Sequence, residues 1–110
     1  MHIVITRPKE DSLYLIENLI RLGHTVTHLP VIKIEKLETE KINLLNYQAV
    51  IFTSSNAIKF MNIEKFNSKI KCFCVGKATE LTARQVGFIN TYTSEGTVDS
   101  LAELIMRTLD

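Results

Sequence analysis

The 110-residue sequence contains no tryptophan, only two prolines, four glycines and two cysteines. So little proline and glycine excludes collagen-like and low-complexity chains, and a hydrophobic content of 45% is typical of a globular protein. Charge begins at Arg7, too early for a secretory signal peptide, and no apolar run approaches the ~18 residues of a membrane span. We therefore expect a cytoplasmic protein that does not cross a membrane.

The sequence has almost no net charge. The formal net charge is +1, whereas a large nucleic-acid footprint normally requires a strongly basic domain with clustered Lys and Arg. Acidic and basic residues are mixed in stretches such as "RPKED" and "EKLETEK", which is typical of solvated faces. Nucleic acid is therefore not an expected partner.

The two cysteines lie two positions apart, at Cys72 and Cys74, inside a run that reads as a strand. A strand points both side chains to one face, roughly 6.5 Å apart along the chain, and a disulfide there would distort it. We expect buried, reduced thiols. His24 and His28 flank another strand at a separation of roughly 13 Å, so no metal site is predicted.

Short β-branched runs alternate with segments of helical periodicity along the whole chain. Strands are expected at 2–6, 25–29, 48–53, 71–76 and 89–93, and helices at 9–22, 40–46, 55–61, 77–87 and 98–109. Residues 31–38, "VIKIEKLE", alternate apolar with charged residues, which suits an edge strand or a linker. The pattern predicts an α/β fold with a parallel sheet and right-handed crossovers.

In a parallel α/β sheet, ligands bind beyond the carboxyl ends of the strands, where helix N-termini offer free N–H groups. The strand-to-helix loops here are 6–10, 53–57, 76–79 and 93–98, and they are rich in hydroxyl, amide and glycine residues. Small polar residues also cap helices, so turn chemistry alone would explain them. The sequence leaves both interpretations open.

The ordered set of motifs resembles one family. "VITRP", "RLGH", "LPVIKIE", "YQAVIFTSSNAIKF", "CVGKATELTARQVGF" and "SEGTVDSLAELI" occur in an order and spacing similar to those of uroporphyrinogen-III synthase. The resemblance implies two flavodoxin-like, doubly wound domains with the active site between them. It also implies a lyase of haem and other tetrapyrrole biosynthesis, which inverts the last ring of hydroxymethylbilane and closes the macrocycle with loss of water, without metal or cofactor.

The resemblance also implies site residues. Ser54 matches the family's strand-to-helix serine and Thr79 its cleft-facing threonine, so Thr79 is the candidate catalytic residue; each has helix capping as its alternative role. Arg7 would pair with a substrate carboxylate, or it is simply solvated. The remaining candidate substrate-binding residues come from the same two loops of the chain: Ser55, Asn56, Gly76 and Lys77.

Relative to the two-domain family fold, both domains are expected to be incomplete. Residues 1–30 would form a βαβ unit of domain one, 31–39 an extended crossover linker, and 40–110 the first part of domain two. The family's cleft tyrosine has no match in Tyr14, Tyr47 or Tyr92. We expect a homodimer, with one chain's N-terminal unit packing against its mate, or a partner chain. The alternatives are a single repacked domain, a gene fragment, or a non-catalytic module that binds tetrapyrroles.

Overall fold

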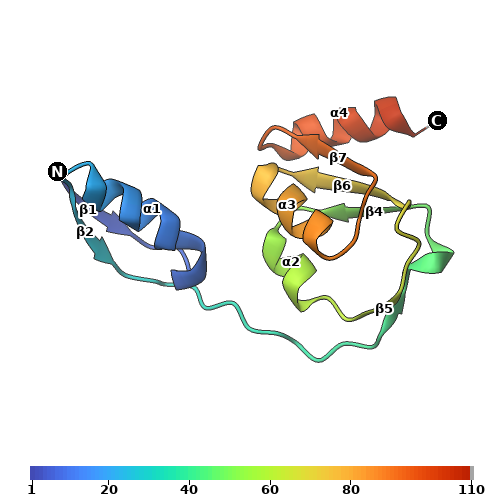
Figure 1. Cartoon of the computed structure of the whole chain (residues 1–110), viewed down its shortest axis with the longest axis horizontal. Coiled ribbons are helices and arrows are strands. Elements are labelled where there is room, and N and C mark those ends of the chain that lie inside the picture. Colours follow the sequence, from blue (N-terminus) through green and yellow to red (C-terminus); the bar gives the residue numbers. More distant parts are fainter. Residues whose placement is uncertain (110) are drawn as a thin grey trace. The chain divides into compact units, whose positions relative to one another are not determined.

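The computed structural model describes residues 1–109, which form two compact units (Figure 1). Unit 1 spans Met1–Lys36 and unit 2 begins at Leu37. Residues 31–41 have no regular secondary structure, and 31–40 are exposed throughout. Within residues 1–109, no helix is long and apolar enough to cross a lipid bilayer.

Unit 1 is a single βαβ element made of β1 (His2–Ile5), α1 (Lys9–Arg21) and β2 (Thr25–His28). The two strands are parallel, with His2 opposite Thr25 and Ile5 opposite His28. α1 packs on one face of this pair and buries Ile5, whereas Val4, which points to the other face, is 58% exposed. Unit 1 therefore has an open sheet face and only two strands.

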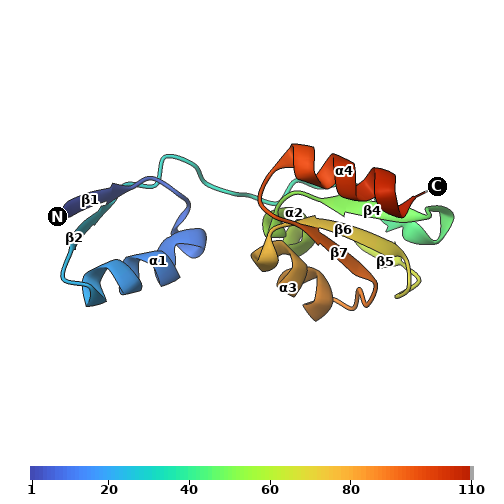
Figure 2. The ribbon, with the colours of Figure 1, turned by 90° about the horizontal axis from the view of Figure 1, so that it is seen from above.

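Unit 2 contains a parallel sheet with the strand order β4-β6-β7, together with a separate parallel pair, β3-β5. Its elements in chain order are β3 (Ile42–Asn43), the 3₁₀ turn η1 (Leu44–Asn46), β4 (Ala49–Phe52), α2 (Ser55–Phe60), β5 (Ile63–Lys65), β6 (Lys71–Val75), α3 (Lys77–Gln85), β7 (Thr91–Ser94) and α4 (Val98–Thr108). α2 and α3 cover one face of the sheet and α4 covers the other (Figure 2). The predicted α/β class with parallel sheets is confirmed.

The core of unit 2 lies mainly between the sheet and α2 and α3. Phe88 is fully buried and contacts Phe52 edge-on and Phe66 face-on, with ring centroids 5.7 and 4.6 Å apart. On the α4 face, Phe73 stacks on Tyr92 at 5.2 Å. β6 is thus buried on both faces, as its continuous apolar run predicts. This packing fixes the central strand and the loop that follows it.

One local prediction was wrong, and one short strand was not anticipated. The helix expected near 40–46 is a strand, β3, followed by the single turn η1, because Asn43 accepts a hydrogen bond from the Leu45 N–H and Ile42 pairs with Ile63. The polar stretch after α2 also contains a strand, β5, which pairs with β3. Most of the other elements begin and end within two residues of the predicted bounds.

Candidate functional site

The carboxyl ends of β4, β6 and β7 lie at one edge of the sheet because the three strands are parallel. Each strand leads directly into a helix, α2, α3 or α4, so three helix N-termini follow this edge. The first turn of a helix carries N–H groups without intrahelical partners and the positive end of the helix dipole. The carboxyl edge of unit 2 is therefore the natural place for an anionic ligand.

The loop after β4 and the first turn of α2 hold Ser54, Ser55 and Asn56, all half-buried. Ser54 is the N-cap of α2, with extended backbone angles, and its Oγ accepts a 3.1 Å hydrogen bond from the Asn56 N–H. The capping role left open by the sequence is thus present. Capping uses an acceptor lone pair of the hydroxyl, so the O–H of Ser54 can still donate to a ligand oxygen.

The loop after β6 consists of Gly76, whose backbone angles (φ 81°, ψ 158°) fall in a region that is essentially restricted to glycine. A Cβ added at Gly76 would meet no atom within 4 Å, so the space over this residue is open. No side chain caps α3 at this position. The N-terminus of α3 thus presents main-chain N–H groups beside open space.

The other two predicted residues of this region, Lys77 and Thr79, lie in the first turn of α3 and differ in accessibility. Lys77, the first residue of α3, is exposed at the same edge and adds positive charge there. Thr79 is only 5% exposed and lies on the buried side of the helix. A substrate could therefore contact Thr79 only through the small part of this residue that is exposed.

Ser94, the last residue of β7, was missed by the sequence reasoning. The residue is 5% exposed, and its Oγ is buried without a hydrogen-bond partner. The following helix, α4, is capped by Thr97, whose Oγ1 accepts from the Ser100 N–H at 3.1 Å. Ser94 lies within the segment 93–98 that the strand-end rule had selected, but nothing in the sequence set it apart from the other polar residues of that segment.

Arg7 belongs to unit 1, whereas the other predicted site residues belong to unit 2. It follows β1, is exposed, and its carbonyl oxygen contacts Nε2 of His28 at 2.9 Å. Beyond the carboxyl ends of β1 and β2 lies a pocket of about 350 Å³. It is lined by Pro8, Lys9, Glu10, Pro30, Val31, Ile32 and Lys33. Unit 1 thus has its own hollow at the edge that the strand-end rule predicts.

A second hollow of about 440 Å³ lies in unit 2, at the opposite edge of the sheet, where β4 and β6 begin. Its lining is Leu44, Leu45, Tyr47, Gln48, Asn67, Lys69, Ile70, Lys71 and Leu109. The N-termini of α2, α3 and α4 do not line it, and the helical turn that does, η1, is a single 3₁₀ turn whose Leu45 N–H already donates to Asn43 Oδ1. We favour the carboxyl edge as the ligand site on this ground.

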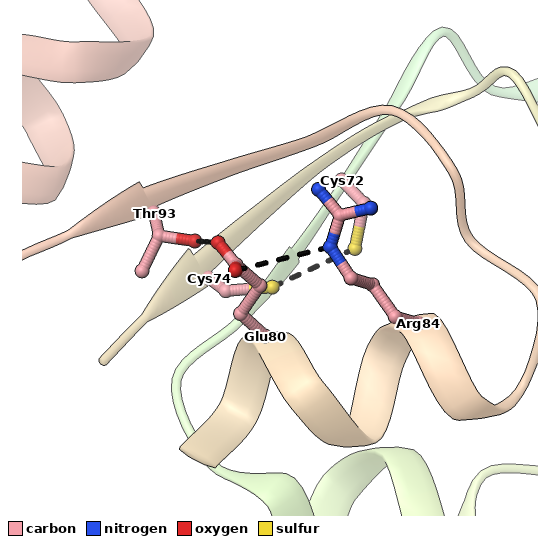
Figure 3. Close-up of polar contacts among 5 residues, drawn as sticks. All are labelled: Cys72, Cys74, Glu80, Arg84 and Thr93. Carbon is pink, nitrogen blue, oxygen red and sulfur yellow. Dashed lines mark hydrogen bonds and ion pairs between the residues drawn. The ribbon is translucent and has the colours of Figure 1, made fainter. Parts of the chain in front are cut away.

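Under α3, the thiols of Cys72 and Cys74 lie 3.8 Å apart. Figure 3 shows the two sulfur atoms facing each other. Contact with Cys74 and burial raise the pKa of the Cys72 thiol, and the hydrogen bond from Cys72 lowers the pKa of Cys74. The predicted buried, free thiols are confirmed. Across residues 1–109, no group of three or more His, Cys, Asp or Glu side chains is placed to hold a metal ion.

The comparisons with known proteins agree with this architecture. Residues 14–110 match the family model described as Uroporphyrinogen-III synthase HemD. The chain belongs to this family. It is also 31% identical, over 107 residues, to the "Porphyrin biosynthesis protein HemD" of Ruminiclostridium josui. That alignment covers 84% of this chain and 21% of the relative, so the chain spans about a fifth of that protein's length.

Family membership confirms the resemblance seen in the sequence motifs. The roles of individual residues, Ser54 and Thr79 above all, stay predictions. Six of the seven candidate residues lie at or beside the carboxyl edge of unit 2, and Arg7 lies at the corresponding edge of unit 1. The carboxyl edges of the two sheets, one in each unit, are therefore the candidate ligand-binding surfaces.

Proposed function

We propose that this chain acts in the synthesis of uroporphyrinogen III and that the carboxyl edge of unit 2 holds carboxylates of linear hydroxymethylbilane. The observation that carries the proposal is the start of α3, where an uncapped helix N-terminus follows a glycine in a glycine-only conformation, beside open space. Main-chain N–H groups and the helix dipole favour a carboxylate there. Family membership supports the choice of substrate.

The residues at this edge would bind different groups of the substrate. The N–H groups of the first turn of α3 receive an acetate or propionate group, and Lys77 adds a positive charge next to them. Ser54, Ser55 and Asn56 offer hydroxyl and amide groups to a second carboxylate. Thr79 would donate its hydroxyl near the reacting ring. Positioning of this kind favours ring inversion and closure over release of the linear tetrapyrrole.

An isomer assay tests the activity. Hydroxymethylbilane closes spontaneously to uroporphyrinogen I, so the purified chain is incubated with it and the I and III isomers are separated after oxidation. Isomer III above the protein-free control is the expected result. Isomer I alone, at the spontaneous rate, would rule out activity of the chain as given.

Thr79→Val then tests the predicted role of Thr79. Valine is nearly isosteric with threonine but lacks the hydroxyl, so the loss of one ligand hydrogen bond should weaken substrate or product affinity by about 1 kcal/mol. Affinity is measured by titration with uroporphyrinogen, alongside urea unfolding of the same variant. Unchanged affinity would limit Thr79 to a structural role in α3.

A second function from another class follows from the short span of the match. The chain aligns with 21% of its HemD relative, and unit 1 contributes only two strands. We propose as the alternative a non-catalytic module that binds anionic tetrapyrroles, or that assembles with a second copy or a partner chain. Saturable uroporphyrinogen binding without formation of isomer III would favour this alternative. Absence of both binding and association would contradict it.

A further inference from the structure

The segment that links β2 to β3 exposes several large apolar side chains. Residues 31–40 are exposed throughout and contain no helix, turn or bend, and Figure 1 draws them as an extended trace. Within the described part of the chain, residues 32–38 make no backbone–backbone hydrogen bond. The exposed apolar residues are Val31, Ile32, Ile34 and Leu37. An extended stretch with unpaired backbone groups and apolar side chains is a template for pairing with another strand.

The charged side chains of this segment form a pattern that complements itself. Lys33 and Glu35 lie on the same side of the extended chain, with Nζ and Oε1 3.0 Å apart. In a two-fold symmetric pair of identical strands, a residue that contacts a second residue of the other copy is itself contacted by the equivalent pair. If Ile34 lies opposite Ile34 of a second, antiparallel copy, each Lys33 lies opposite a Glu35. The four charges then alternate in sign around a square.

The residues on either side of this square also match in the same register. Ile32 lies opposite Lys36, whose alkyl stem can pack along an apolar side chain, and Val31 lies opposite Leu37. Because alternate residues of a strand share a face, one face of the ribbon gathers Ile32 and Ile34 of both copies, and the Lys–Glu pairs lie on the other. Each large side chain of residues 31–37 therefore meets a compatible one.

Symmetry and charge disfavour the other registers. The two-fold axis has to pass between two copies of the same residue, because directly opposed side chains point to the same face. A charged residue at the centre would face its own charge, which is destabilising. Leu37 at the centre would place Ile34 against Glu40, and Ile32 at the centre would bring Pro30, which has no N–H, into the ladder. Ile34 is the remaining centre.

We propose that residues 31–37 are a self-pairing strand through which two copies of the chain associate, antiparallel and centred on Ile34. The contact does not involve the carboxyl edge of unit 2, so it holds whether or not that edge binds a tetrapyrrole. A two-stranded ribbon alone is only marginally stable in water, and a stable dimer has to bury further apolar surface. The sheet face of unit 1 that exposes Val4 is one such surface.

Disulfide trapping tests the centre of the pair in the full chain. Directly opposed residues of antiparallel strands have Cα atoms about 4.5–5.5 Å apart, within the disulfide range. Ile34→Cys should therefore give a covalent dimer with oxidised glutathione, seen on a non-reducing gel. Ile32→Cys is the matched control, because its two copies would lie about 13 Å apart along the ribbon. The native Cys72 and Cys74 are fully buried and should not react. Equal trapping of the two variants, or no trapping of Ile34→Cys, would overturn the proposal.

Charge reversal tests the ion pairs without an introduced cysteine. Lys33→Glu places glutamates opposite each other and Glu35→Lys places lysines opposite each other, so each variant alone should self-associate several-fold more weakly at low salt. In an equimolar mixture of the two variants every glutamate can face a lysine, and the dimer should return. Sedimentation velocity of each variant, of the mixture and of the parent chain measures this. A mixture that behaves as the average of its components, or a monomeric parent chain, would contradict the contact.

Discussion

The main-chain N–H of Gly76 donates a 3.0 Å hydrogen bond to the carbonyl oxygen of Ser94. This bond joins the end of β7 to the loop that follows β6, so two of the three loops at the carboxyl edge are held together through the backbone. Gly76 makes the bond in a conformation that residues with a Cβ avoid. The shape of the edge therefore depends on this one glycine.

Gly76→Ala should destabilise unit 2 by about 1–3 kcal/mol. The cause is backbone strain alone, since the space around the added Cβ is open. Urea unfolding followed by circular dichroism measures the change, and ligand affinity should fall with it if the N-terminus of α3 binds carboxylates. A variant as stable as the parent chain would show that the loop can adopt another conformation, and the edge would then not be rigid.

Ser54 allows capping and ligand binding to be separated. Ser54→Ala removes the cap of α2 and should cost about 1 kcal/mol, whereas Ser54→Asp keeps an N-cap acceptor and should fold with near-normal stability. Aspartate also places a negative charge beside the proposed carboxylate site. Affinity for uroporphyrinogen should therefore drop in Ser54→Asp although stability does not.

Titration of the two Ser54 variants distinguishes the roles. Weak binding by both, with a stability loss only in Ser54→Ala, supports substrate contact. If Ser54→Asp binds uroporphyrinogen as tightly as the parent chain, Ser54 is a helix cap and the ligand lies elsewhere.

Periodicity predicted most of the fold because the central strands are governed by burial. The run that became β6 is apolar throughout, and its interior residues Cys72, Phe73 and Cys74 are fully buried. The short pair β3-β5 was missed for the opposite reason. Its strands are two and three residues long, and β5 carries Glu64 and Lys65, so neither has a recognisable hydrophobic pattern.

The candidate site was predictable in position and less so in detail. Strand-end placement put Ser54 and Gly76 at one edge, as parallel topology requires. The sequence does not tell which hydroxyl of a polar loop is buried: Thr79 is nearly inaccessible, and Ser94 holds a buried, unpartnered Oγ. These differences arise from which side of a helix or strand faces the core, and that depends on packing between elements.

Thr93 and Glu80 connect β7 to α3, because the Thr93 hydroxyl donates to the Glu80 carboxylate. Thr93→Val leaves a largely buried carboxylate short of a donor and should cost about 1–3 kcal/mol of unfolding free energy. Thr82→Val is the matched control. Its hydroxyl bonds the Ala78 carbonyl within the same helix, so the change should stay within about 0.5 kcal/mol. Equal effects of the two substitutions would contradict a specific role for the Thr93–Glu80 bond.

The open face of unit 1 motivates the last prediction, which concerns assembly. The β1-β2 pair has two free edges, and Val4 is exposed on the face that α1 does not cover. Unpaired edges and apolar faces favour association, and a second copy of the chain would cover them through identical elements.

Sedimentation at micromolar concentration should therefore show a species near twice the 12.5 kDa chain mass. Val4→Lys should shift this species toward the monomer, whereas Tyr14→Lys, on the exposed side of α1, should not. A well-folded monomer of the unmodified chain would refute the dimer and leave unit 1 to pack against a different partner.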